Sequence, residues 1–82
     1  MSETEVLDKV EQYIRQRQPQ EFLLNVVRQG VRHEGNWWYV VVQPVPPDIS
    51  ARTYQEVMEE AEEDMDQREH VNVLLLPNLP GD

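Results

Sequence analysis

The sequence contains no cysteine in its 82 residues, and this absence excludes several kinds of protein. A disulfide framework, a thiolate zinc site and a cysteine nucleophile all require the missing residue type. Small secreted domains usually depend on disulfide bonds, so a cytoplasmic location is expected. Residues 1–9 carry acids but no apolar stretch, which predicts that there is no signal peptide.

Glycine and serine are also scarce. The three glycines, Gly30, Gly35 and Gly81, lie too far apart to form a phosphate-binding loop. The only serines, Ser2 and Ser50, stand where helices are expected to begin, and neither lies in a nucleophile elbow. We therefore expect no enzymatic activity, no catalytic residue and no cofactor.

Basic residues are few and acidic residues are many. Seven lysines and arginines stand against sixteen acids, which gives a net charge of −9. Phosphate backbones repel such a surface, so nucleic acid is not an expected partner. No apolar run approaches the roughly 18 residues that a membrane span needs, so no membrane association is expected either.

Helical periodicity predicts two amphipathic helices. The first is expected over residues 3–17, because Ser2 and Glu5 have the spacing of a capping box and apolar residues recur on one face up to Ile14. The second is expected over residues 50–68, with one apolar stripe and a strongly acidic opposite side. Pro19 ends the first helix.

Three dense apolar segments predict strands at residues 21–32, 37–43 and 71–76. The first two are joined by residues 33–36, where Gly35 suits a hairpin turn. Gly30 predicts either a bulge or a large cross-strand neighbour lying over the backbone.

The predicted fold class is α+β, in the order α-β-β-α-β, as a single domain over residues 1–77 with a flexible tail over 78–82. The expected sheet has three strands, is mainly antiparallel in the order 2-1-3, and carries both helices on one face. The first strand is placed in the centre because it is apolar on both faces. Direct contact between strands two and three, which gives a mixed sheet, is the alternative.

Apolar side chains on both faces of this sheet predict an uncovered apolar surface. In the run Trp37, Trp38 and Tyr39, neighbours point to opposite faces, so one tryptophan faces the helices and the other faces away. The run has two interpretations, as core filling or as a binding anchor on the open face. Arg28 and Arg32 are the basic residues available beside it.

The acidic side of the second helix also has two interpretations. Residues 50–70 contain eight acids and two arginines. A solvated helix face accounts for this pattern, and so does a docking surface for a basic partner, for which Glu59, Glu63 and Asp66 are the candidate residues. No metal site is expected, because the only histidines, His33 and His70, lack convergent ligands.

The sequence therefore favours a small protein-interaction module, an adaptor, a regulator or a homodimer, that binds another protein or a second copy of itself through an apolar sheet face. The alternative is an acidic inhibitor, antitoxin-like or a mimic of nucleic acid, that binds a basic partner through the second helix.

Overall fold

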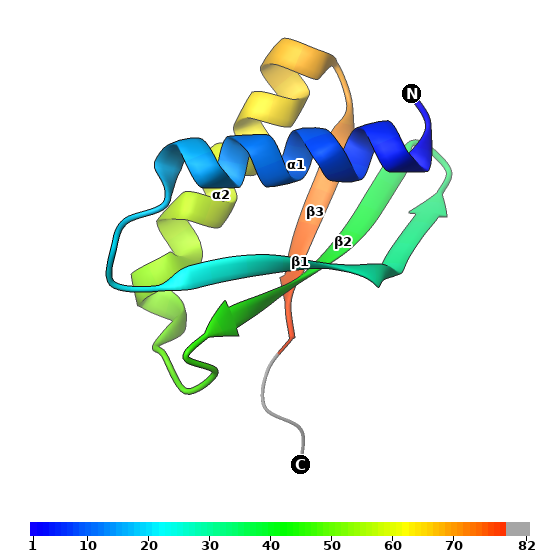
Figure 1. Ribbon diagram of the computed structural model, residues 1–82. Helices are drawn as coiled ribbons and strands as arrows, with labels where there is room; N and C mark the ends of the chain where they lie inside the picture. Colours follow the sequence, from blue (N-terminus) through cyan, green and yellow to red (C-terminus); the bar gives the residue numbers. More distant parts are fainter. Residues whose placement is uncertain (79–82) are drawn as a thin grey trace.

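The computed structural model describes residues 1–78 and has five elements in the predicted order (Figure 1). Their bounds are α1 Glu3–Arg17, β1 Leu23–Glu34, β2 Trp37–Val45, α2 Ala51–Glu69 and β3 Asn72–Pro77. The fold class is α+β, as predicted. The predicted C-terminal tail falls, from residue 79 onward, outside the described residues.

Side-chain caps define the ends of both helices. At the start of α1, Ser2 Oγ accepts a hydrogen bond from the Glu5 N–H while the Glu5 carboxylate accepts one from the Ser2 N–H, which is the expected capping box. Ser50 Oγ accepts from the Arg52 N–H at the start of α2. Helix α2 ends at Glu69, and the capping residue His70 adopts a left-handed conformation with φ 58° and donates its N–H to the Met65 carbonyl.

The sheet has the order β1-β2-β3, so the predicted order 2-1-3 is wrong. Strand β2 is central, with β1 antiparallel on one side and β3 parallel on the other, which makes the sheet mixed rather than mainly antiparallel. The connection from β2 through α2 to β3 links neighbouring parallel strands, which is the usual arrangement of a β-α-β unit.

The physical reason for this order lies in β1 and β2. Buried and more exposed residues alternate along β2, and its helix-facing residues Val40 and Val42 are fully buried, as expected for a strand with neighbours on both sides. Strand β1 buries only Leu24 completely and exposes most of its later residues. The apolar residues Leu23 and Leu24 at its start are typical of a central strand. The exposed residues at its other end are typical of an edge strand.

The hairpin has the predicted turn and the predicted irregularity. Gly35 adopts φ 59°, which a β-carbon would disfavour. The β1–β2 register shifts between Val27 and Arg32. A β-carbon added to Gly30 would lie 2.9 Å from Val41 Cγ2, so Gly30 serves both expected roles: it lies within the bulge and beneath a cross-strand side chain.

Both helices cover one face of the sheet. Helix α1 packs against β1 and α2, and α2 packs against β3 (Figure 1). One hydrophobic core lies between these layers. Its strand residues include Leu24, Trp38, Val40, Val42, Val73 and Leu75. The opposite face of the sheet carries no helix among the described residues.

Candidate functional site

The sheet face away from the helices, which we call the open face, exposes most of the large apolar side chains that are not in the core. Six large hydrophobic residues of the described chain are exposed, and all except Met1 lie on this face. They are Leu23, Trp37, Val45, Leu74 and Leu76. The predicted surplus of apolar sheet surface is therefore present, and single scattered side chains do not account for it.

The two tryptophans occupy opposite faces, as expected. Trp37 is 46% exposed on the open face, whereas Trp38 is 8% exposed and belongs to the core. The ring of His33 stacks on Trp38 with centroids 3.8 Å apart and planes 5° apart. Trp37 is thus available to a partner, and Trp38 is part of the core that supports it.

The strands contribute very little charge to the open face. Its only charged side chains from β1, β2 or β3 are Arg32 and Glu34, which form an exposed ion pair at 3.4 Å. Arg32 lies opposite Tyr39 in the β1–β2 register. These residues, with Gly30, Val41 and Leu76, line a hollow of about 410 Å³. The other predicted arginine, Arg28, turns to the helix side, where it hydrogen-bonds Asp8 at 2.6 Å and also bonds Glu11.

Seven of the eight acids of α2, all except Glu56, fall into two rows with different environments. The first row faces α1 and is paired. Arg17 donates to Asp64 from Nε at 2.9 Å and from Nη2 at 2.7 Å, and to Glu60 at 3.0 Å. Glu69 accepts from the Tyr13 hydroxyl at 2.5 Å and lies 3.8 Å from the Lys9 ammonium. This row joins the two helices.

The second row, which we call the edge stripe, consists of Glu59, Glu62, Glu63 and Asp66. These residues have the spacing i, i+3, i+4, i+7, so they share one side of α2. None of the ion pairs within residues 1–78 includes a member of the edge stripe. The stripe is a concentration of negative charge without an ion-pair partner in the described chain.

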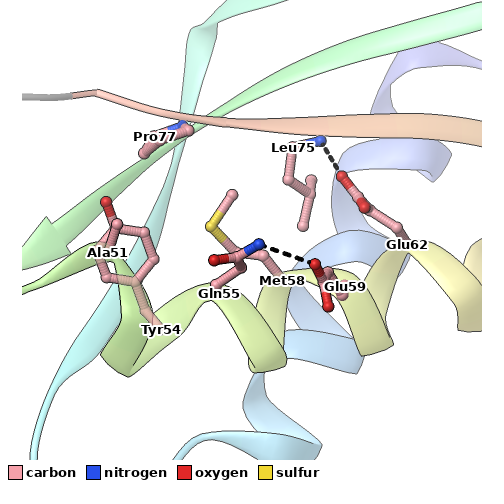
Figure 2. Close-up of a pocket in the computed structure, with 8 residues that line it drawn as sticks. All are labelled: Ala51, Tyr54, Gln55, Met58, Glu59, Glu62, Leu75 and Pro77. Carbon is pink, nitrogen blue, oxygen red and sulfur yellow. Dashed lines mark hydrogen bonds between the residues drawn. The ribbon is translucent and has the colours of Figure 1, made fainter.

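The edge stripe borders the unpaired edge of β3. One hollow of about 380 Å³ contains all four stripe carboxylates together with Trp37, Asn72, Val73 and Leu74. An adjoining hollow of about 260 Å³ shares Glu59 and Glu62 with it, and its apolar wall comes from Tyr54, Met58, Leu75 and Pro77 (Figure 2). We call the two together the edge groove. Three acids predicted as partner-binding therefore share a hollow with Trp37, one of the three aromatic residues predicted as partner-binding.

Glu62 holds a particular position in the edge groove. Its Oε2 atom accepts a hydrogen bond from the Leu75 backbone N–H at 2.7 Å, so a side chain of α2 occupies an outward-facing donor of β3 (Figure 2). Burial raises the pKa of Glu62 above its ordinary 4.5, the Leu75 N–H lowers it, and neighbouring Glu59 raises it further. The ionised carboxylate is thus held where water solvates it poorly.

The sequence-based site did not include Glu62, Leu75 or Tyr54. The spacing of Glu59, Glu63 and Asp66 already pointed to Glu62, which completes the same stripe. The tyrosine had no such signal, because it reads as one more apolar position of α2. Its side chain is buried, and no residue in the described part of the chain hydrogen-bonds its hydroxyl.

The two histidines line a hollow to which no acidic side chain contributes. His33 and His70 line one hollow of about 390 Å³ with Met1, Asn36 and Trp38, and no carboxylate lines it. Within residues 1–78, no group of three or more potential ligands is arranged to hold a metal ion. Neither helix in the same part of the chain has the combination of length and apolar composition that is needed to cross a membrane.

The open face and the edge groove are thus the two candidate sites, and they meet at Trp37. No protein-family model matches the chain, and comparisons with curated proteins and with solved structures found no significant similarity.

Proposed function

We propose that this chain is a small protein-interaction module whose open face binds a second copy of itself. The observation that carries the proposal is the gathering of Leu23, Trp37, Val45, Leu74 and Leu76 on one uncovered sheet face. Water is a poor solvent for such a surface, and burying it against a matching surface is favourable. Binding without catalysis is the proposed activity, with the cytoplasm as the proposed location because the chain lacks cysteine.

The charge distribution favours a second copy in spite of the net charge of −9. Two sheets packed face to face lie about 10 Å apart, with helices about 10 Å beyond each of them. The acidic helices of the two copies would then be separated by about 30 Å, well beyond the Debye length of about 8 Å at physiological salt. The open face itself brings only the pair Arg32 and Glu34, which has no net charge.

A two-fold axis through this face would also satisfy its charges. In a symmetric dimer the same patch meets itself, so Arg32 of one copy can approach Glu34 of the other. The exposed Trp37 and the half-buried Tyr39 supply the kind of aromatic anchors that dominate interfaces. We infer a sandwich of two sheets with helices on both outer sides.

Sedimentation equilibrium over a range of concentrations tests this proposal. The wild-type chain should show a mass of twice 9.7 kDa that falls toward 9.7 kDa on dilution. Leu76→Lys places a charge on the open face and should give a monomer. Gln16→Lys adds the same charge to an exposed position on α1 and should leave the dimer intact. A wild-type monomer throughout, or equal effects of both substitutions, would contradict the proposal.

A second candidate function, the binding of a basic partner through α2, is supported by the edge stripe. The row of acids that faces α1 is already paired with Arg17 and Lys9. Within the described residues of α2, the stripe, which spans about 10 Å of helix, combines high charge with the absence of ion pairs. Such a short stripe favours a small basic segment over the broad surface of a protein that binds nucleic acid.

A further inference from the structure

We propose that the edge groove binds an extended basic segment of a partner protein, which adds to the sheet as a fourth strand along β3. This inference deepens the second candidate function and does not depend on the open face. Strand addition to a free sheet edge is a common mode of peptide recognition, in which main-chain hydrogen bonds supply affinity and flanking side chains supply specificity.

The free edge of β3 offers the required main-chain groups. The Leu75 N–H points away from β2, because it donates to Glu62. Backbone groups alternate in direction along a strand, so those of Val73 point the same way as those of Leu75. Pro77 lacks an N–H and therefore ends the row of donors. An added segment can pair across Val73 and Leu75.

The walls of the groove suit an extended chain with apolar and charged side chains. Figure 2 shows Tyr54 and Met58 of α2 opposite Leu75 and Pro77 of β3, with Gln55 and Glu59 along the helix side. Gln55 donates a hydrogen bond to Glu59 at 3.0 Å, which holds that carboxylate at the groove wall. An apolar side chain fits the end lined by Tyr54 and Met58, and cations fit the rest.

The charge of the groove selects among the possible occupants. A second copy would bring its own edge stripe to the same place, so four carboxylates without ion-pair partners would face four more. A basic segment instead places ammonium or guanidinium groups beside Glu59, Glu63 and Asp66. The negative charge lies on α2, next to the free edge of β3. This position therefore favours lysine or arginine side chains on an added strand.

The Glu62 side chain occupies a main-chain donor of this edge, and an added strand can replace it there. Sheet edges are commonly protected by a charged side chain or another element that occupies their free groups. The Glu62 carboxylate does this at Leu75 while it is partly removed from water and close to Glu59. A strand carbonyl can take over the Leu75 N–H, and a basic side chain of the same segment can then neutralise the released carboxylate.

Tyr54 provides an independent observation in favour of a ligand. Its side chain lines the groove, and its buried hydroxyl hydrogen-bonds no residue within 1–78. Buried polar groups are nearly always paired, so a buried hydroxyl without a partner needs an explanation. A small displacement of the wall by an incoming segment would give this hydroxyl an acceptor.

Amide-resolved NMR titration tests the proposal with defined probes. The probe is a capped peptide of alternating lysine and valine as long as β3, six residues. It should bind saturably, shift the amide resonances of Val73 and Leu75, and slow hydrogen exchange at Val73. A peptide with glutamate in place of lysine should not bind, and a peptide with a central proline should bind at least about tenfold more weakly, because proline removes a main-chain donor.

Two chain variants separate a binding role from a structural one. Tyr54→Phe removes the buried hydroxyl and should leave folding intact, while the affinity for the lysine–valine peptide should fall by a few fold. The double variant Glu63→Gln with Asp66→Asn should lower the affinity for the same peptide by about fivefold at low salt. The matched control, Glu21→Gln with Glu56→Gln, removes the same charge from exposed positions outside the groove and should bind as the wild type does.

Several outcomes would overturn the inference. Absence of saturable binding would do so, as would equal binding of the proline-containing peptide, which would indicate charge attraction without strand pairing. The Leu76→Lys variant distinguishes the two surfaces, because it alters the open face and not the groove. If that variant loses the peptide, the peptide occupies the open face and the proposal is wrong.

Discussion

The Glu62 carboxylate accepts a hydrogen bond from the Leu75 N–H at 2.7 Å, and this contact joins α2 to the outer edge of β3. The bond closes the edge, but the carboxylate is partly buried beside Glu59, which raises its pKa above 4.5. Glu62 thus both joins α2 to β3 and lines the edge groove, so its titration reports on the stability of the fold and on the state of the groove.

A raised pKa of Glu62 in the folded chain has a definite consequence for stability. The folded state holds this proton more tightly than the unfolded state, so the contribution of Glu62 is fully present below about pH 4.5 and is lost as pH rises through the folded pKa. Glu62→Gln keeps an acceptor for Leu75 and cannot titrate. Between about pH 4.5 and 7, we expect urea unfolding to show the variant gaining stability relative to the wild type. A constant difference across this range would contradict the raised pKa.

The contact of Arg17 with Asp64 predicts an unequal effect of removing two arginines. Asp64 is 8% exposed and depends mainly on Arg17, since Arg68 approaches only to 3.6 Å. Arg17→Met leaves this carboxylate poorly paired and should lower the melting temperature by several degrees. Arg32→Met breaks only an exposed pair with Glu34, so calorimetry should detect little change. Equal effects would show that Asp64 does not need its partner.

The close approach of Gly30 to Val41 predicts a cost for any larger residue in the bulge. Gly30→Ala places a β-carbon 2.9 Å from Val41 Cγ2, and crowding of this kind destabilises by about 1–3 kcal/mol. In a Val41→Ala background the cost should be smaller, because the contacting methyl group is gone. A double-mutant cycle from urea unfolding measures the difference, and equal costs in both backgrounds would contradict the packing explanation.

The opposite placement of Trp37 and Trp38 is testable by fluorescence quenching. We expect Trp38, seen alone in Trp37→Phe, to resist acrylamide at every protein concentration because it lies in the core. Trp37, seen alone in Trp38→Phe, should be quenched readily in dilute solution and become shielded as copies associate. Adding Leu76→Lys should keep Trp37 accessible at all concentrations. Shielding of Trp37 in that monomeric background would argue against its exposure on the open face.

Most of the fold was predictable because local signals agree with it. The capping box at Ser2 and Glu5 and the apolar stripes located the helices, and Gly35 located the hairpin turn. Strand order was not predictable in the same way, since Leu23 and Leu24 have the appearance of a buried strand at one end of an edge strand. Strand β2 is central because it pairs with β1 along one edge and with β3 along the other. This pairing is a property of the tertiary structure, which local sequence signals do not specify.

The same error in strand order concealed part of the site. In the order 2-1-3, Trp37 would lie across the sheet from β3 and far from the acids of α2. In the observed order Trp37 pairs in register with Asn72 and shares a hollow with Glu59, Glu63 and Asp66. Sequence reasoning found these residues separately, as an aromatic anchor and an acidic helix face, and their meeting depends on β2 and β3 being neighbours.

Isotope-filtered nuclear Overhauser spectroscopy on an equal mixture of labelled and unlabelled chains tests the central proposal most directly. Face-to-face pairing of the open faces predicts contacts between copies that join Trp37, Tyr39 and Leu76 to residues of the same face. Association with contacts confined to α1, α2 or the edge of β3, or no contacts between copies at any concentration, would contradict it.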